Sequence, residues 1–238
     1  MHSAYEPRLA RVAAMIADPA RSRMLAYLLD GHRASAGELA QAGSVAASTA
    51  SAHLAKLEAA GLVAAERRGR HRYFRLADAE VAQALEALAL VAERSSHERA
   101  WDGAPRRELR FARRCYGHLA GTLGVALLDG LLRRGHVVAD ADTDAGGGFA
   151  LSDGGATWLR SIGVDPETLP RARRLAYGCL DWSERRDHLA GPLAARLLDH
   201  FVASGWLRAE PGSAGRPRTR VLALTPTGQR TLLPMLAA

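Results

Sequence analysis

The sequence predicts a mainly α-helical protein with short β-strands, built from an N-terminal domain, a linker and a duplicated C-terminal domain. Three observations support this prediction. Apolar residues recur at helical spacing through the first hundred residues. A polar stretch near residue 100 interrupts that pattern, and a His-Leu-Ala-Gly motif occurs twice after it, 70 residues apart. We expect domains at 1–97 and 106–238, a linker at 98–105, and repeats near 106–165 and 172–238.

Composition narrows the function classes. The chain has 238 residues, of which 48% are hydrophobic, so it can form globular cores. Its net charge of +7 favours a polyanionic partner such as nucleic acid. Two cysteines are too few for a disulfide scaffold. No apolar run is long enough for a membrane span and no secretion signal is evident, so we expect a cytoplasmic protein without a membrane partner.

The N-terminal domain begins with four predicted helices. Pro19 suits the first turn of the second helix, and Ser35 with Glu38 predicts a capping box on the third. Glycines end the second, third and fourth helices. A strand at 62–64, a basic turn and a strand at 71–76 follow, and then a last helix. The expected helices are 4–16, 20–29, 36–42, 47–60 and 79–94.

This order is typical of a winged helix-turn-helix, whose second helix of the pair enters the major groove while the basic wing lies against the backbone. Small and polar residues on that helix would let it approach base edges. Each group alone also fits a solvated surface, but their order favours DNA binding. The predicted DNA-binding residues are Ala47, Ser48, Thr49, Ser51, Ala52, His53 and Lys56 of the helix and Arg67, Arg68, Arg70 and Arg72 of the wing.

Residues 10–94 resemble the ArsR/SmtB family of winged-helix regulators. The resemblance rests on IADPARSRML at 16–25, GELA at 37–40, and STASAHLAKLEAAGLV at 48–63 with the basic segment 67–76 after it. It implies a dimeric repressor, paired through the first and last helices of this domain, that leaves DNA when an effector binds.

The sequence departs from the family pattern at several positions. Ala52 stands where the family commonly has arginine, which removes one expected DNA contact. The cysteine pair that metal sensors carry near Glu38 is missing. Asp78 and Glu80 could mimic one ligand pair of the last helix, but Val91 and Arg94 stand where the other pair belongs. We therefore expect none of the family's known metal sites in this domain.

The C-terminal half contains an internal repeat. Residues 118–123 match 188–193, and 127–129 match 197–199, both with an offset of 70 residues. Residues 150–152 resemble 223–225, three positions out of step. Each repeat is interpreted as helix, helix, strand, loop, strand, helix, which is again a winged-helix outline. Duplication by itself indicates no function.

Three roles compete for this half: a structural extension, a small-molecule effector domain, and a thiol or metal sensor. The effector role is favoured because aromatic residues gather here, namely Tyr116, Trp158, Tyr177, Trp182 and Trp206. The segment 181–188 is either an exposed helix start with internal ion pairs or one wall of the effector site. The side chains offered to a polar ligand there are Trp182, Glu184, Arg185 and Arg186.

The sensor role rests on Cys115 and His118, three apart and expected on one helix face, together with Cys179 and His188. Two cysteines and two histidines suit zinc, and the two histidines are equivalent in the repeat. Neighbouring arginines are expected to lower the thiol pKa values; these are Arg113, Arg114, Arg185 and Arg186. The spacing from Cys179 to His188 is not a standard ligand spacing, so we expect no bound metal and no other cofactor.

An enzyme and a protein-interaction adaptor are the rival classes. Cys115 with His118 could act as nucleophile and base, but no third orienting residue accompanies them and no phosphate-binding loop is present. The sequence therefore predicts a non-enzymatic, sequence-specific regulator that binds double-stranded DNA as an effector-released homodimeric repressor and senses a small molecule. Thiol-redox or metal sensing is the alternative, and an adaptor without DNA binding is a distant one.

Overall fold

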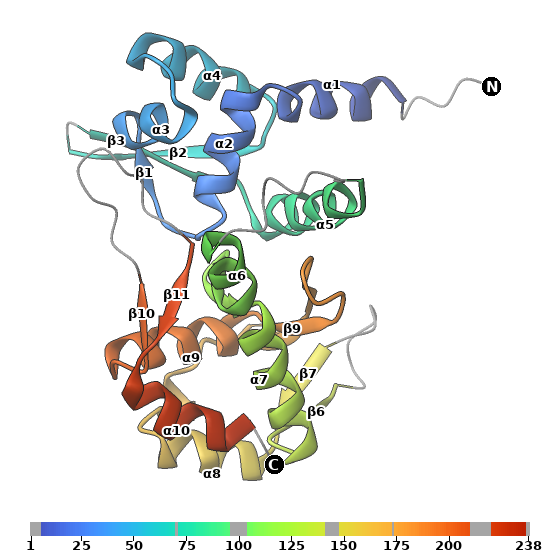
Figure 1. Ribbon diagram of the computed structural model, residues 1–238, viewed down its shortest axis with the longest axis vertical. Helices are drawn as coiled ribbons and strands as arrows, with labels where there is room; N and C mark the ends of the chain where they lie inside the picture. Colours follow the sequence, from blue (N-terminus) through green and yellow to red (C-terminus); the bar gives the residue numbers. More distant parts are fainter. Residues whose placement is uncertain are drawn as a thin grey trace. The chain divides into compact units, whose positions relative to one another are not determined.

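The computed structural model describes residues 6–69, 71–95, 104–140, 148–172, 174–209 and 220–236 (Figure 1). The chain forms two compact units. The N-terminal unit comprises Met1–Leu85 with Pro211–Thr219, and the C-terminal unit comprises Glu86–Glu210 with Arg220–Ala238. Helix α5 (Ala79–Ser95) runs from the first unit into the second. The predicted domain limits, 1–97 and 106–238, remain a prediction.

The N-terminal unit is the predicted winged helix-turn-helix. It contains α1 (Glu6–Ile16), α2 (Pro19–Leu28), β1 (Ala34–Ser35), α3 (Ala36–Gly43), α4 (Ala47–Ala59), β2 (Val63–Arg68) and β3 (His71–Leu76). The strands pair antiparallel in the order β1-β3-β2. The sequence did not predict β1, whose two residues are too short for an alternating pattern.

Local signals position the helix-turn-helix pair. The Ser35 side chain accepts the backbone N–H of Glu38, and the Glu38 carboxylate accepts the N–H of Ser35, so the predicted capping box is confirmed. Ser44 ends α3 in the left-handed conformation, which turns the chain into α4. The inward faces of α2, α3 and α4 bury Met24, Leu25, Leu39, Leu54 and Leu57 in the core.

The C-terminal unit contains two series of elements in the same order: hairpin, helix, hairpin, helix. After α6 (Ala104–Phe111), the first series is β4 (Arg113–Cys115), β5 (His118–Ala120), α7 (Thr122–Arg133), β6 (Val137–Ala139), β7 (Gly148–Leu151) and α8 (Asp153–Ser161). After a short 3-10 helix (Pro166–Thr168), the second is β8 (Ala176–Leu180), β9 (Asp187–Ala190), α9 (Pro192–Ala203), β10 (Leu207–Ala209), β11 (Leu222–Leu224) and α10 (Pro226–Leu236).

A β-hairpin stands where the sequence predicted a helix carrying Cys115 and His118, so that prediction is wrong. Tyr116 and Gly117 join β4 to β5 in two residues, with φ angles of 44° and 95°. Positive φ at both central positions is what a tight hairpin turn requires, and Gly117 adopts it without strain. The strands have three residues each, too few for a strand pattern to compete with helical spacing.

The two series exchange strands. In the sheet β6-β7-β8-β9, the second hairpin of the first series pairs with the first hairpin of the second series. In turn, the two residues just before β11 lie beside β4, where the N–H of Arg114 donates to the carbonyl of Arg220 at 2.8 Å. Leucines of both series share one core, including Leu119, Leu189, Leu127 and Leu197. The hairpins β4-β5 and β8-β9 meet through β5 and β9.

Candidate DNA-binding surface and a buried cysteine–histidine cluster

Helix α4 has a buried face and an exposed face. Ala50, Leu54 and Leu57 are buried, as the sequence predicted. The predicted DNA-binding residues Ala47, Ser48, Thr49, Ser51, Ala52 and Lys56 are exposed. The Ser51 hydroxyl donates to the carbonyl of Ala47 at 2.9 Å, which keeps this side chain close to the helix. This face is therefore narrow and rich in small residues, as a helix that approaches base edges requires.

His53 lies differently from the expectation that it faces outward. Only 15% of its side chain is exposed, and its Nδ1 lies 3.2 Å from Nη1 of Arg21. Arg21 also donates to the carbonyls of Ala14 and Met15 at the end of α1. His53 therefore belongs to the junction of α1, α2 and α4, because the turn between the helices points this position back toward α2.

Two of the wing arginines, Arg68 and Arg72, already have carboxylate partners. Arg72 of β3 contacts Glu58 of α4 at 2.5 Å, and Arg68 of β2 contacts Glu66 at 2.9 Å. Arg67 is exposed, while Arg70 lies outside the described residues. Contact with a phosphate by Arg68 or Arg72 would have to replace a surface ion pair, and such pairs stabilise a protein only weakly.

The four candidate cysteine and histidine residues converge inside the C-terminal unit. One nitrogen or sulfur atom from each of Cys115, His118, Cys179 and His188 lies within 4.8 Å of all the others. All four residues are buried, and His188 is 0% exposed. The Nε2 atoms of the two histidines lie 3.0 Å apart. The convergence that the repeat predicted is therefore present, although no helix creates it.

Strand pairing explains the convergence. Cys115 is the cross-strand partner of His118 in the β4-β5 hairpin, and Cys179 is the cross-strand partner of His188 in the β8-β9 hairpin. Directly opposed residues have Cβ atoms about 4.5–5.5 Å apart, so each hairpin presents one thiol beside one imidazole. Contact between β5 and β9 brings the two Cys–His pairs together.

The second hairpin has a longer loop, and this loop carries Asp181. The Oδ2 atom of Asp181 lies 3.2 Å from Nδ1 of His188 and accepts the N–H of Gly121 at 2.6 Å. Its Oδ1 atom accepts from Nη2 of Arg113 at 2.9 Å and from the Ser183 hydroxyl at 2.7 Å. Burial opposes the charge of Asp181, but these partners hold the pKa of its carboxyl well below the usual range.

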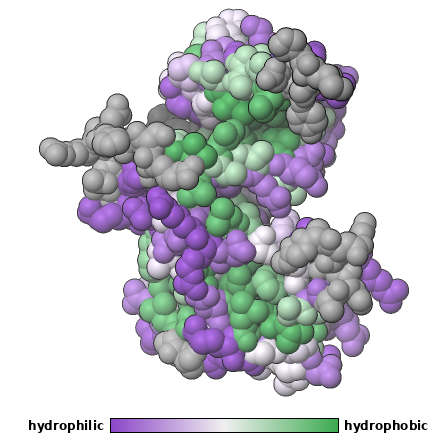
Figure 2. Space-filling model, turned by 90° about the vertical axis from the view of Figure 1, so that its right-hand side faces the viewer, coloured by the Kyte–Doolittle hydropathy of each residue, from purple (hydrophilic) through white to green (hydrophobic). Residues whose placement is uncertain are grey.

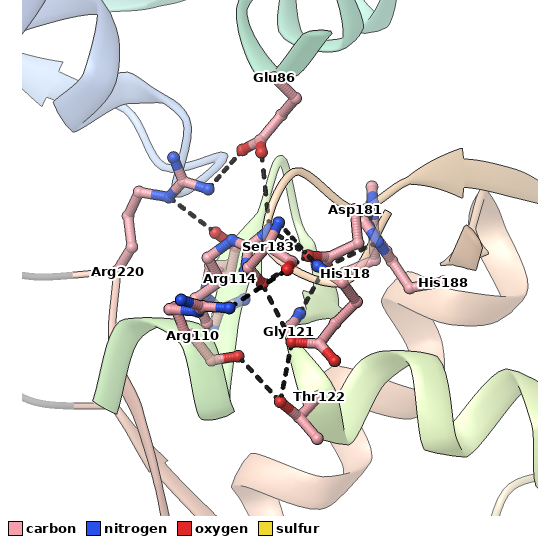
Figure 3. A network of polar contacts seen from close by, with 12 residues as sticks. Glu86, Arg110, Arg114, His118, Gly121, Thr122, Asp181, Ser183, His188 and Arg220 are labelled. Carbon is pink, nitrogen blue, oxygen red and sulfur yellow. Dashed lines mark hydrogen bonds and ion pairs between the residues drawn. The ribbon is translucent and has the colours of Figure 1, made fainter. Parts of the chain in front are cut away.

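Arg113 connects Asp181 to helix α5. Its side chain is fully buried, its guanidinium lies over the Trp182 ring at 4.5 Å, and Nη2 is 3.7 Å from Oε2 of Glu86. The other Glu86 oxygen accepts from Nη2 of Arg220. Figure 3 shows this network, with Glu86 at the top, Arg220 on the left and His118 and His188 on the right. Burial disfavours a charged Glu86, but Arg220 and Arg113 lower the pKa of its carboxyl.

The expected lowering of the thiol pKa by arginines is wrong for Cys115. A hydrogen bond with Cys179, together with burial, raises the pKa of the Cys115 thiol to about 12. The arginines bind elsewhere: Arg113 engages Asp181, and Arg186 makes two hydrogen bonds to Asp129. Arg185 is exposed. Burial lowers the pKa of the His188 imidazole, but Asp181 and Cys115 outweigh burial and raise this pKa above its ordinary value.

The residues predicted to form a wall for an organic ligand are engaged by the protein itself. Trp182 is buried beneath Arg113, and Glu184 accepts the Thr122 hydroxyl at 3.1 Å. Tyr116 is half-buried at the turn of the first hairpin. The segment 181–188 is a loop and a strand instead of the exposed helix start considered from the sequence.

Sequence reasoning missed Asp181, Glu86 and Arg220 as participants. The helical spacing of Val81, Leu85, Leu88 and Val91 predicts that this face of α5 is the buried one. Leu88 and Val91 are instead exposed, and Glu86 is buried. The sequence around Glu86 does not indicate that this residue is buried, because its partners Arg113 and Arg220 are distant in the chain. Among the described residues, no helix is long and apolar enough to cross a membrane.

Comparison with known proteins places the chain. Residues 16–65 match a family model described as a helix-turn-helix domain. The HTH-type transcriptional regulator YdfF of Bacillus subtilis is 36% identical over 224 residues, which cover 94% of each chain. The HTH-type transcriptional regulator CmtR of Mycobacterium tuberculosis is 42% identical over 86 residues, 36% of this chain and 72% of CmtR.

Two solved structures match the N-terminal part. The first is the homodimeric winged helix-turn-helix DNA-binding domain of Mb0332 from Mycobacterium bovis, described as a possible ArsR-family regulator. It is 31% identical, covers 40% of this chain and 91% of its own, and has a TM-score of 0.36. The second is the cadmium metal-sensor CmtR, 41% identical over 35% of this chain and 85% of its own, with a TM-score of 0.31. With YdfF matching almost end to end, the chain belongs to the HTH-type transcriptional regulators, and its residues 16–65 form the helix-turn-helix part.

Proposed function

We propose that the protein is a sequence-specific, homodimeric DNA-binding repressor whose C-terminal unit senses the effector that releases it from DNA. The exposed face of α4 supports this best. Ser48, Thr49 and Ser51 are exposed on it and can bond base edges in the major groove. Lys56 and Arg67 supply exposed charge for phosphates. The net charge of +7 agrees with a polyanionic partner.

Exposed apolar residues on α1 and α5 support a homodimer. Leu9 of α1 is 68% exposed, and Leu88 and Val91 of α5 are 48% and 47% exposed. Leu88 and Val91 are three apart, so they lie on one face of α5. Figure 2 shows hydrophobic residues, in green, reaching the surface among hydrophilic ones. Pairing of two copies through these helices would cover the apolar side chains and present two recognition helices to two half-sites.

The effector-sensing role is assigned to the cysteine–histidine cluster. Trp182 and Glu184, which the sequence offered for an organic ligand, are held by Arg113 and Thr122. The two thiols and two imidazoles of the cluster, in contrast, converge in the buried core and face one another. We further infer that the two series of elements are repeats, since each carries one cross-strand Cys–His pair.

The test is fluorescence anisotropy with labelled DNA from upstream of the protein's own gene, in the presence of reductant and chelator. The wild-type chain should bind, and more weakly as salt increases. Ser51→Glu should weaken binding at least about tenfold, because one base contact contributes about 1–3 kcal/mol and the new charge faces DNA.

Thr157→Glu is the matched control. The Thr157 hydroxyl donates to the carbonyl of Asp153 at 3.0 Å on an exposed face of α8, as Ser51 does to Ala47 on α4. This variant should bind DNA like the wild type. Equal binding by wild type and Ser51→Glu would overturn the DNA-contact assignment. A folded dimer without any salt-sensitive DNA binding would favour the adaptor function instead.

A further inference from the structure

We propose that Cys115, His118, Cys179 and His188 form a tetrahedral site for one divalent cation of the zinc class, Zn²⁺ or Cd²⁺. The proposal of a metal site rests on the positions of the four donor atoms and does not depend on the proposed function. The added statement that this ion is the effector rests on the proposed function, because it requires a regulator that binds DNA.

The donor atoms lie at distances that suit one ion. In a tetrahedron with bonds of about 2.3 Å to sulfur and about 2.0–2.1 Å to nitrogen, nitrogens lie about 3.3 Å apart and sulfurs about 3.8 Å apart. The Nε2 atoms of His118 and His188 are 3.0 Å apart, and all four donor atoms lie within 4.8 Å of one another. Shifts of less than about 1 Å, accessible to side-chain rotation, would complete the coordination.

The donor types select the class of metal. Two thiols and two imidazoles suit zinc-class ions, whereas Mg²⁺ and Ca²⁺ require oxygen ligands. Four protein ligands fill a tetrahedral shell, and all four side chains are buried. A closed site of this kind leaves no coordination position for a substrate, so it serves binding and conformational control instead of catalysis.

Asp181 orients one ligand. Because its carboxylate lies 3.2 Å from Nδ1 of His188, the Nε2 of that histidine points to His118 and the thiols. Carboxylates commonly fix metal-binding histidines in this way. Asp181 is itself held by the N–H of Gly121 and by Arg113, so the ring is fixed before an ion binds. A glycine is required at 121, where a Cβ would lie 2.4 Å from the carbonyl of Arg110.

An apolar-core explanation fits these residues poorly. Buried cysteines often act as small hydrophobic residues, but buried imidazoles are costly without polar partners. Here two imidazoles share their Nε2 contact with each other and face two thiols. A disulfide between Cys115 and Cys179 would use the thiols and leave the histidines without a role. A metal ion uses all four groups.

The test uses the full chain, reduced and freed of metal with chelator, and then titrated with Co²⁺ as a spectroscopic probe. We expect one Co²⁺ per chain, the visible absorption of tetrahedral cobalt, and a thiolate-to-cobalt charge-transfer band. Zn²⁺ should displace the cobalt. Octahedral cobalt, no binding by folded protein, or a mass spectrum that shows an intramolecular disulfide in the reduced sample would overturn the site.

Substitutions distinguish the residues that bind the metal from Asp181, which orients one of them. Cys115→Ser should remove much of the charge-transfer band and weaken Co²⁺ binding more than about 100-fold, beyond the 10–100-fold loss typical of an orienting partner. Asp181→Asn should weaken binding about 10–100-fold while the band keeps its position. His136→Gln, whose ring stacks on Trp158 in the same unit, should bind Co²⁺ like the wild type. Circular dichroism must show each variant folded. An unchanged spectrum in Cys115→Ser would overturn the assignment.

Anisotropy on the same samples distinguishes the two proposals. Metal binding without any DNA binding would overturn the proposed function and leave the site. DNA binding without metal binding would overturn the site and leave the function. DNA affinity that does not change when Zn²⁺ binds would overturn the role of the ion as effector. We expect zinc to weaken DNA binding at least about fivefold, at the lower end of typical allosteric coupling.

Discussion

The Nε2 atoms of His118 and His188 lie 3.0 Å apart, although 70 residues separate them along the chain. Each histidine has a cysteine as its cross-strand partner, so the contact between the two rings also brings the two thiols close. From this relationship follow expectations for stability and for regulation.

Zinc should stabilise the C-terminal unit against unfolding. A ligand that binds the folded state alone adds about 2.7 kcal/mol at 100 times its dissociation constant. Thermal unfolding followed by circular dichroism, with Zn²⁺ and then with excess chelator, measures this difference. The shift should disappear in Cys179→Ser and persist in His136→Gln. An equal shift in Cys179→Ser would locate the zinc elsewhere.

Glu86→Gln should reduce the coupling between metal and DNA. Glu86 lies in α5 and contacts Arg220 and Arg113, and Arg113 holds the Asp181 carboxylate beside His188. An amide keeps the shape but loses the charge that attracts Arg113. The ratio of DNA dissociation constants with and without Zn²⁺ should move toward one, while Co²⁺ binding keeps its tetrahedral spectrum. A ratio equal to that of the wild type would exclude this route.

Glu86 should also contribute to the acid sensitivity of folding. Arg220 and Arg113 outweigh the effect of burial and lower the pKa of Glu86 below the ordinary value of 4.5. A lowered pKa in the folded state gives stability that is fully present above the unfolded pKa and is lost as pH falls through the folded pKa. Urea unfolding between about pH 6 and about pH 3 should therefore show a shallower loss in Glu86→Gln than in the wild type. Glu80→Gln, at an exposed position of α5, should follow the wild type.

Glu58→Gln should strengthen DNA binding. The Glu58 carboxylate forms an ion pair with Arg72 at 2.5 Å, and the negative charge of Glu58 repels phosphates. The amide would free Arg72, so the slope of log affinity against log salt should steepen by up to about one unit. Anisotropy over a salt series measures this slope. Glu80→Gln removes the same charge away from the wing, and an equal gain in that variant would assign the effect to net charge alone.

Leu88→Asp should separate the proposed dimer. Leu88 is 48% exposed on α5, and a charge there would be buried without a partner if two copies pair through this helix. Analytical ultracentrifugation should show a monomer that remains folded. Leu180→Asp, at a residue of β8 that is 44% exposed, is the matched control and should remain a dimer. A dimeric Leu88→Asp would place the interface elsewhere.

The N-terminal unit could be predicted closely because its signals are local. Ser35 and Glu38 define a helix start by themselves, and the apolar spacing of Ala50, Leu54 and Leu57 defines the inner face of α4. The boundaries of α2 to α5 fall within one residue of those expected. His53 was misplaced because its contact with Arg21 depends on how α2 packs against α4, which no local pattern encodes.

The buried cluster could be predicted only in part. The offset between His118 and His188 suggested that two equivalent segments meet, and they do. The spacing of Cys115 and His118 was interpreted as helical, since three residues fit one helix face as well as they fit a two-residue hairpin turn. The spacing of Cys179 and His188 is not a standard ligand spacing, but strand pairing places the two residues opposite each other whatever the length of the loop between them. Long-range pairing of this kind leaves little trace in a single sequence.

The strand exchange within the C-terminal unit has a consequence for synthesis of the chain. Until His188 leaves the ribosome, the nascent chain contains at most three of the four ligands. The segment that lies beside β4, just before β11, is synthesised later still. The helices and strands of the winged helix, by contrast, all precede residue 96 in the chain. Under the proposed function, a prematurely ended product would therefore keep the exposed face of α4 but lack the complete metal site, and would bind DNA without being released by the ion.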